Sequence, residues 1–246
     1  MKKNLFTTSL LAWLMCLLMP ARVMAVKAEV DGIWYEFFES EKIAIVVTSQ
    51  GNPYWGDIVI PSMVNYGGNP YIVLYIGSLA FDRCDGLTSV TIPPSVTHIG
   101  EYAFYYCSSL TSITIPEGVT NIEYAAFQNC SGLTSITIPK GVKRIEECTF
   151  QGCSGLTSMV VASGNTVYDS RENCNAIIET STNRLIAGCK NTVIPESVTS
   201  IGDYAFYGCS GLTSITIPER VTSIGGSAFY VSYLLLRVQR YKLIDN

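Results

Sequence analysis

The chain has 246 residues, of which 48% are hydrophobic and 15% are charged, and its formal net charge is −4. An acidic balance without clustered Lys and Arg excludes the basic surface that binding to nucleic-acid phosphates requires. After the first 25 residues no segment is long and apolar enough to cross a bilayer. The length is sufficient for a substantial core in one or two domains.

Residues 1–25 have the layout of a secretory signal peptide. Lys2 and Lys3 give a positive start, the apolar run LLAWLMCLLMP follows, and VMA places small or short side chains before a cut after Ala25. A membrane anchor is the competing interpretation, but the apolar run is too short to span a bilayer comfortably. The sequence predicts an exported protein that is secreted, periplasmic or on the cell surface. Cleavage would leave 13 basic and 20 acidic residues, a net charge of −7.

The remaining chain is dominated by an internal repeat. The nine residues SGLTSITIP occur at 131–139 and again at 210–218, with close variants at 85–93 and 108–116. A period of this kind, 23 residues, lies in the range of leucine-rich repeats, in which each unit is one turn of a solenoid. The same 23-residue step relates Phe81, Phe104, Phe127 and Phe150, relates Cys84, Cys107, Cys130 and Cys153, and separates Phe206 from Phe229.

Each unit combines a strand with a turn. The segment LTSITIP alternates apolar and hydroxyl residues, which indicates a half-buried strand, and Pro116 ends it because proline cannot donate to a ladder. The segment that follows, around Ala103-Phe104 and its copies, is predicted to be a short helical or 3₁₀ turn. One unit cannot bury its own apolar face, so neighbouring units must stack into a parallel sheet. The sequence thus predicts a β-rich repeat solenoid over 71–233.

The motif L-T-S-I-T-I-P…I-G-x-x-A-F-x-x-C resembles the BspA-type leucine-rich repeat of bacterial surface and secreted proteins. The resemblance extends over about 55–233 and is strongest in 85–155 and 192–230. It implies a leucine-rich-repeat solenoid and, for function, surface adhesion to host proteins or to other cells.

The repeat is interrupted by an insert at about 160–191. Ile138 and Ile194 are 56 residues apart, which is two periods plus ten. The sequence NAIIETSTNRLIAG predicts a hairpin that pairs Ile178 with Leu185. Two interpretations remain open: a protruding loop that contacts a partner, or a decorated solenoid turn. The resemblance implies similar inserts in BspA-like proteins, which favours the structural interpretation.

Both ends of the solenoid differ from the repeat. Residues 26–70 are predicted to form a β-rich N-terminal cap, with two strands joined at Glu39–Lys42 and a weak copy of the strand motif in GDIVIPSMV. Residues 234–246 are either a degenerate C-terminal cap or a truncated end. The N-terminal cap is rich in aromatic side chains that are either core residues or a set for stacking on sugars: Trp34, Tyr35, Phe37, Phe38, Tyr54 and Trp55.

The cysteines fall into two groups. In the predicted hairpin Cys174 lies opposite Cys189, so this pair is the candidate disulfide. The others that recur lie three residues after the repeated phenylalanine, where a small, soft side chain suits a buried position. We predict an interior ladder of free thiols there, with bridges between turns as the alternative: Cys84, Cys107, Cys130, Cys153 and Cys209.

No pattern of residues indicates catalysis. The one histidine, His98, occupies a variable position of the repeat, so arrangements that depend on it have no partner motif. The spacing of the cysteines does not match a metal site, and there is no phosphate loop or dinucleotide fingerprint. Carboxylates such as Asp31 and Glu36 are scattered without the pairing that a glycosidase uses. The sequence predicts a protein that is not an enzyme and that uses no cofactor or metal.

The outward strand positions are the remaining candidates for function. They carry hydroxyl groups that, once stacked, make a flat and uncharged face. Threonine also simply suits a soluble strand, so a docking face and a structural role both remain open. The predicted function is binding of a protein or cell-surface macromolecule, with glycan binding or processing by the N-terminal aromatic residues as the alternative. The candidate binding face comprises Ser89, Thr91, Ser112, Thr114, Ser135, Thr137, Ser214 and Thr216.

Overall fold

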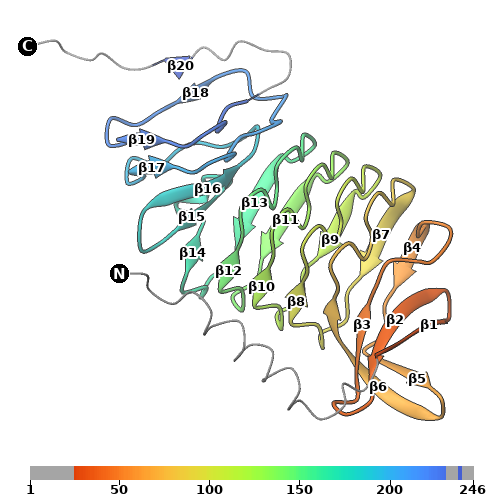
Figure 1. Ribbon diagram of the computed structural model, residues 1–246. Coiled ribbons are helices and arrows are strands. Elements are labelled where there is room, and N and C mark those ends of the chain that lie inside the picture. Colours follow the sequence, from red (N-terminus) through yellow and green to blue (C-terminus); the bar gives the residue numbers. More distant parts are fainter. Residues whose placement is uncertain (1–24, 231–237, 240–246) are drawn as a thin grey trace, which may run out of the picture.

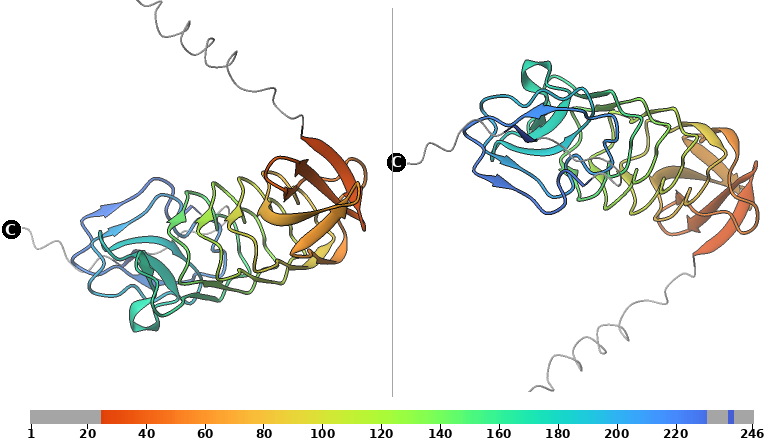
Figure 2. Two further views of the ribbon diagram at one scale, coloured as in Figure 1. Left: turned by 90° about the horizontal axis from the view of Figure 1, so that it is seen from below. Right: turned by 90° about the horizontal axis from the view of Figure 1, so that it is seen from above.

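The computed structural model describes residues 25–230 and 238–239, so the predicted signal peptide lies outside the described residues except for Ala25. The described chain is an elongated body of short strands and turns, with a β-rich cap at one end (Figures 1 and 2). Its helical content is the 3₁₀ helix η1 (Arg171–Asn173), and these described residues contain no α-helix. The fold is the predicted repeat solenoid.

The LTSITIP motif forms the first edge of each solenoid turn. Its strands pair in parallel with a shift of one unit, so that Val90 lies beside Ile113 and both side chains point into the core. Where neighbouring strands form few ladder hydrogen bonds, other backbone N–H groups link the units, as in the 3.3 Å bond from the N–H of Thr134 to the carbonyl of Thr111. The first edge consists of β4 (Gly56–Val59), β7 (Leu87–Thr91), β9 (Ser112–Thr114), β11 (Ser135–Ile138) and β13 (Ser158–Val161).

A second edge is built from two-residue strands. Each points one isoleucine into the turn and a polar neighbour outward; Ile99 and Ile122 are buried, and Ile145 is partly buried. This edge contains β8 (His98–Ile99), β10 (Asn121–Ile122) and β12 (Arg144–Ile145), which pair in parallel and extend the last strand of the cap, β6 (Asn69–Ile76).

The N-terminal cap covers the open end of the stack. Its strands β2 (Ile33–Phe38) and β3 (Ile43–Val46) are antiparallel and meet at the predicted turn Glu39–Lys42. Tyr35 and Phe37 are buried beneath the sheet. Two further strands complete it: β1 (Val26–Val30) pairs with β2, and β5 (Met63–Tyr66) forms a hairpin with β6, which also pairs in parallel with β3. The cap thereby pairs with the first strand of the second edge, whose backbone N–H and C=O groups would otherwise be exposed.

The third edge of each turn is not helical, so the prediction of a helical or 3₁₀ turn is wrong. Ala103 donates its N–H to the carbonyl three residues back, but Tyr102 and Tyr106 have φ values of 54° and 57°. Left-handed residues at this spacing prevent a helix. They also turn alternate N–H groups outward to the next unit, as in the 2.8 Å bond from Phe104 to Ala126. The result is a chain of successive turns that ties neighbouring units together.

Phenylalanine rings stack behind this third edge. The rings of Phe81, Phe104, Phe127 and Phe150 lie nearly parallel, with successive centroid separations of 5.0, 5.2 and 5.8 Å. Burial of these large apolar rings provides much of the hydrophobic stabilisation of the stack. The separation grows toward Phe150, where the regular repeat ends.

The insert replaces one solenoid turn. The 23-residue register continues past residue 160, because Lys143 binds Thr166 and the N–H of Ile145 donates to the Tyr168 hydroxyl. The chain then forms an antiparallel sheet that joins the second edge of the later units. Its strands are β14 (Tyr168–Asp169), β15 (Ala176–Glu179) and β16 (Arg184–Gly188), and β16 continues in parallel into β17 (Ser200–Ile201) and β19 (Ser223–Ile224).

The two faces of the β15–β16 hairpin contribute to two separate cores. Ile177 and Ala187 pack with the preceding stack, whereas Ile178 and Leu185 pack with the units that follow. All four side chains are buried. The hairpin therefore separates the two cores, and only its tip at 180–182 is exposed.

The last strand pair lies at the far end of the solenoid. Strand β18 (Ile215–Thr216) pairs in parallel with β20 (Val238–Gln239), and Ile215 faces Val238 one period later. The other residues of the predicted C-terminal segment 234–246 lie outside the described residues, so a cap and a truncated end both remain predictions. No helix in the described ranges is long and apolar enough to span a membrane.

Candidate binding surfaces

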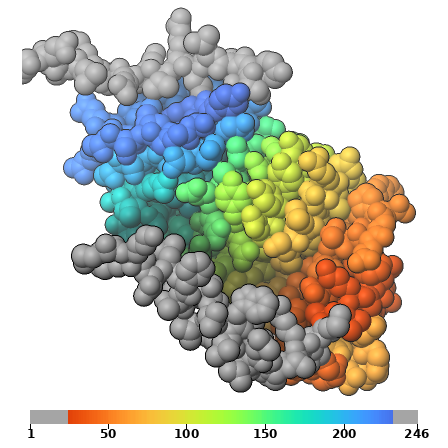
Figure 3. Space-filling view, in the orientation of Figure 1, coloured from red at the N-terminus to blue at the C-terminus, as the bar shows by residue number. Residues whose placement is uncertain are grey.

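The predicted hydroxyl residues form a surface along the first edge. In β9 the exposed side chains of Ser112 and Thr114 flank the buried Ile113. The parallel register repeats this arrangement, and the strands lie side by side along the body (Figure 1). In space-filling view the successive units are in direct contact (Figure 3). We call this surface the hydroxyl face: Ser89, Thr91, Ser112, Thr114, Ser135 and Thr137.

A carboxylate marks the cap end of the hydroxyl face. Asp57 lies opposite Ser89 in the β4–β7 register and accepts hydrogen bonds from Thr88 and Ser89, both of 2.7 Å. These bonds, from Thr88 first, lower the pKa of Asp57 below its usual range. Sequence reasoning missed this residue, although GDIVIPSMV was identified as a weak copy of the strand motif. Alignment of that copy with β7 would have placed Asp57 in the outward row.

The other two predicted face residues are separated from this surface. Ser214 and Thr216 are exposed, but β18 pairs with β20 and not with β13. At its far end the hydroxyl face borders Val160, which is 42% exposed. The predicted face of eight residues is thus one row of six and a separate pair.

The structure places the repeated cysteines in the interior as free thiols. Cys107, Cys130 and Cys153 donate their S–H groups to carbonyls of the preceding unit at 3.0–3.1 Å. Desolvation by burial is the main reason that the pKa of Cys84 rises to about 11 and that of Cys209 to about 12. Such thiols are poor nucleophiles and poor metal ligands, so they serve packing.

The expected disulfide between Cys174 and Cys189 is not formed, because both are free and buried. A bulge between Ile177 and Ile178 explains the error. Ile178 does face Leu185 as predicted, but on the other side of the bulge the register shifts by one residue and takes the cysteines out of opposition. Each thiol instead donates to a backbone carbonyl, that of Ala176 for Cys174 and that of Asn175 for Cys189.

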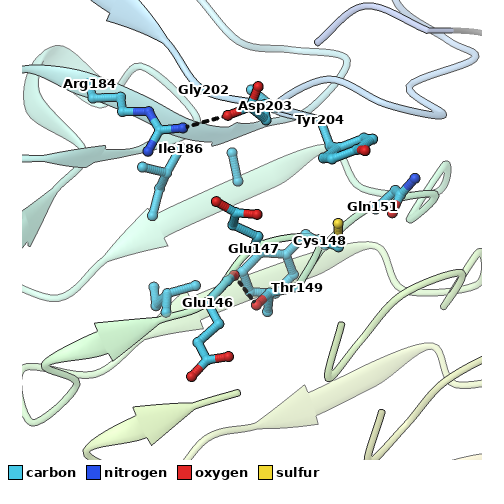
Figure 4. Close-up of a pocket in the computed structure, with 14 residues that line it drawn as sticks. Glu146, Glu147, Cys148, Thr149, Gln151, Arg184, Ile186, Gly202, Asp203 and Tyr204 are labelled. Carbon is cyan, nitrogen blue, oxygen red and sulfur yellow. Dashed lines mark hydrogen bonds and ion pairs between the residues drawn. The ribbon is translucent and has the colours of Figure 1, made fainter. Parts of the chain in front are cut away.

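A small cavity with both polar and apolar lining lies where the regular stack meets the insert (Figure 4). It has a volume of about 70 Å³ and lies between the turn at 146–151 and the turn at 202–205. Glu147 points into this space, and the pair of Arg184 and Asp203, 3.1 Å apart, lies beside it (Figure 4). We call this junction the seam. Its size suits a few water molecules better than an organic ligand.

The seam exists because the carbonyl of Ala205, the expected acceptor for the N–H of Phe150, accepts a hydrogen bond from the insert instead. In a regular unit the N–H equivalent to that of Phe150 donates to the carbonyl of the next unit, as Phe127 donates to Thr149 at 3.0 Å. Here Gly188 donates to Ala205 at 2.8 Å instead. Among the described residues the N–H groups of Cys148 and Phe150 therefore have no acceptor. The ladder resumes beyond them with a 3.0 Å bond from Gly152 to Tyr207.

His98 lies on the second edge and is half-buried. Its Nδ1 is 2.8 Å from the Thr97 hydroxyl, and its ring packs against Tyr75. In the part of the chain that the structure describes, no group of three or more His, Cys, Asp or Glu side chains is arranged to hold a metal ion.

The aromatic residues of the cap divide into core and surface. Tyr35, Phe37 and Tyr54 are buried. Trp34 is half-buried, Trp55 is 80% exposed, and both line one cleft of the cap. The core interpretation thus applies to part of the set.

Comparison with known proteins agrees with the fold. A leucine-rich-repeat protein from Bacteroides ovatus ATCC 8483 is 25% identical with a TM-score of 0.52, over 80% of this chain and 55% of that one. The pneumococcal vaccine antigen PcpA is 17% identical with a TM-score of 0.59, over 84% of this chain and 68% of that one. A leucine-rich cell surface protein from Faecalibacterium prausnitzii A2-165 is 25% identical with a TM-score of 0.45, over 83% and 73%. No curated protein matches the sequence.

The family model of the BspA type leucine rich repeat region matches the chain in six copies, over residues 74–186 and 176–239. These matches span well over half of the chain and include the solenoid strands from β7 onward, the third-edge turns and the insert described above. The protein belongs to the BspA-type leucine-rich-repeat family.

Proposed function

We propose that this protein is an exported, non-enzymatic binding protein that presents its repeat solenoid to a macromolecule, either a host protein or the surface of another cell. Family membership supports a repeat-based binding role. The predicted signal peptide supports export. The observation that carries the proposal is the hydroxyl face.

The hydroxyl face has the properties of a broad docking surface. Its hydroxyl groups both donate and accept hydrogen bonds, and they repeat with the spacing of the stacked strands. The strands beneath them are fixed by the ladder and by buried side chains such as Ile136, so a partner meets a preorganised surface. The face carries no charge until Asp57 at its cap end. A partner with a polar, largely uncharged contact surface fits it.

Binding of the mature chain, residues 26–246, to an array of immobilised extracellular-matrix proteins tests the proposal. We expect saturable binding to at least one of them. The variants Thr114→Lys and Thr137→Lys, in the centre of the hydroxyl face, should weaken it about tenfold or more, since each adds an unpaired charge to the interface.

The matched control is Asn121→Lys, which adds the same charge on the second edge. It should leave binding unchanged. Absence of binding to every matrix protein and to intact host cells, or binding that is indifferent to both threonine variants, would contradict the proposal. Cell fractionation, together with N-terminal sequencing for the expected cut after Ala25, tests export separately.

A further inference from the structure

The cap contains a cleft that the hydroxyl face does not use. It lies between the turn that joins β1 to β2 and the loop that leads from β3 to β4, and its volume is about 360 Å³. This is within the usual size range of small-molecule sites. We call it the tryptophan cleft; the side chains that define it are Glu29, Trp34, Gln50, Asn52 and Trp55.

Trp55 is exposed to an extent that core packing does not explain. Its side chain is 80% exposed, although tryptophan is among the side chains that gain most from burial. Its position is nonetheless fixed. A Cβ atom at Gly86 would come within 2.2 Å of the indole ring, so the ring lies directly on this glycine, and the N–H of Gly56 donates to the Gly86 carbonyl at 2.9 Å. The arrangement holds a flat aromatic surface toward solvent.

The floor of the cleft connects the segments that carry the two tryptophans. Tyr54 is buried, and its hydroxyl donates to the carbonyl of Val47 at 2.9 Å while it accepts the N–H of Trp34 at 2.8 Å. Its ring packs against Phe81, the first ring of the phenylalanine stack, at a centroid distance of 4.8 Å. Trp34 and Trp55 are therefore held on one rigid support, which reduces the entropic cost of binding.

The rim of the cleft supplies polar groups that carry no positive charge. Gln50 and Asn52 provide side-chain amides and Glu29 provides a carboxylate, and all three are exposed. Amides and carboxylates bind neighbouring hydroxyl groups well, because they offer donors and acceptors in pairs. No Lys, Arg or His side chain lines the cleft. An anionic ligand would meet only the negative charge of Glu29.

We propose that the tryptophan cleft binds neutral hexopyranose units of a glycan. The apolar C–H face of a pyranose packs on an indole ring, and its equatorial hydroxyl groups reach the amides and the carboxylate on the rim. A prolyl peptide would use the aromatic rings, but its proline residues offer no N–H donor to the Glu29 carboxylate. A quaternary ammonium ion would require an aromatic enclosure, and Trp55 is too exposed to provide one.

The site can be tested with its own optical probe. The chain has three tryptophans, and Trp13 lies in the predicted signal peptide, so both tryptophans of the mature chain line the cleft. We expect neutral glucose-, galactose-, mannose- or N-acetylhexosamine-based tetrasaccharides, titrated to millimolar concentration, to change the tryptophan fluorescence of residues 26–246 saturably. Isothermal titration calorimetry should give the same dissociation constant.

Trp55→Ala should weaken sugar binding about tenfold or more and leave thermal unfolding almost unchanged, because the side chain is mostly exposed. Gln50→Ala should also weaken binding. The matched control Tyr106→Ala removes an exposed aromatic ring from the third edge and should have no effect. Thr114→Lys should likewise leave sugar binding intact, which separates this site from the hydroxyl face.

Three results would overturn the proposal. One is the absence of binding to every neutral tetrasaccharide; another is binding that Trp55→Ala does not alter. The third is Trp55-dependent binding of choline or of a proline-rich decapeptide in place of sugars. Each of these leaves the matrix-protein test of the hydroxyl face unaffected, so the two proposals fail independently.

Discussion

The regular stack and the C-terminal block both pack the repeated phenylalanine rings, but they use different neighbours to do so. We define the stack as residues 77–153 and the block as residues 170–230. In the stack each ring from Phe81 to Phe127 meets an equivalent ring in the next unit, and Phe104 lies between two of them. In the block the ring of Phe206 meets Phe229 on one side but a glycine, Gly188, on the other.

This difference shows what exact repetition provides. Each stack unit is both the donor and the acceptor of an identical neighbour, so the interface needs no special residues. Where an insert intrudes, the interface has to be rebuilt from unlike parts. At the seam this costs two backbone hydrogen bonds, those of Cys148 and Phe150, and requires a residue without a side chain at position 188. The seam should be the weakest interface of the solenoid.

The largest expected effect is the loss of a ring from the stack. Phe104→Ala removes a fully buried side chain with a ring on each face and should lower the free energy of unfolding by about 3–5 kcal/mol. Phe229→Ala, at the end of the block, should cost roughly half as much, since Phe229 is only partly buried. Urea denaturation measures both, and equal costs would contradict the contrast between the two regions.

A smaller change tests the glycine at the seam. Gly188→Ala places a Cβ atom within 2.2 Å of the Phe206 ring, so the block should lose about 1–3 kcal/mol through overpacking. Near-ultraviolet circular dichroism during denaturation should show the block melting earlier while the stack is retained. As a control, Gly211→Ala meets only the side chain of Lys190, with Cδ nearest at 3.0 Å, and should change stability by less than about 0.5 kcal/mol. A Gly188→Ala variant with unchanged stability would contradict the close approach of residue 188 to the Phe206 ring.

Hydrogen exchange sharpens the comparison amide by amide. The N–H groups of Cys148 and Phe150 should exchange at least about tenfold faster than their equivalents Ala125 and Phe127, which are bonded to the next unit. A tenfold difference corresponds to about 1.4 kcal/mol of protection. Equal protection at the two places would mean that the seam is closed in solution.

The smallest expected effect depends on pH. Burial opposes ionisation of Asp169, but its hydrogen bonds with Arg171 and Thr180 outweigh this and hold its pKa below 3.8. A carboxyl whose pKa is depressed in the folded state stabilises above its unfolded pKa, and that contribution disappears as the pH falls through the folded value. The block should therefore lose less than about 1 kcal/mol between pH 4 and pH 2. Asp169→Asn should flatten this loss, whereas Glu219→Gln should not.

The repeat period predicted which residues point inward, but it did not predict the left-handed turns or the β-bulge. A 23-residue step identifies Ile113 or Phe104 as buried without knowledge of the backbone. The left-handed turns were missed because Tyr102 and Tyr106 adopt positive φ values that the sequence signals only when glycine is present. The expected disulfide failed on a single-residue bulge, which no pairing rule anticipates.

The candidate sites also differ in whether they depend on local or on long-range features. The hydroxyl face was predictable, since strand alternation is a local property. The sequence offered Trp34 and Trp55 within a set of six aromatic residues but did not show that these two line one cleft, because this depends on a long-range bond from Trp34 to Tyr54 and on the absence of a side chain at Gly86. Long-range contacts of this kind leave no periodic trace in the sequence.

The cysteine ladder has a consequence for the biogenesis of the protein. A chain that crosses a membrane unfolded, as the predicted signal peptide implies, exposes eight mature thiols to any oxidant it meets. Once each thiol is sealed inside a turn, with a raised pKa in the case of Cys107 and Cys130, it no longer forms the reactive thiolate. Outside the seam, contacts between neighbouring units of the stack are one period apart, so this region has the low contact order that favours rapid folding. Speed of folding, and not a disulfide framework, would protect these cysteines.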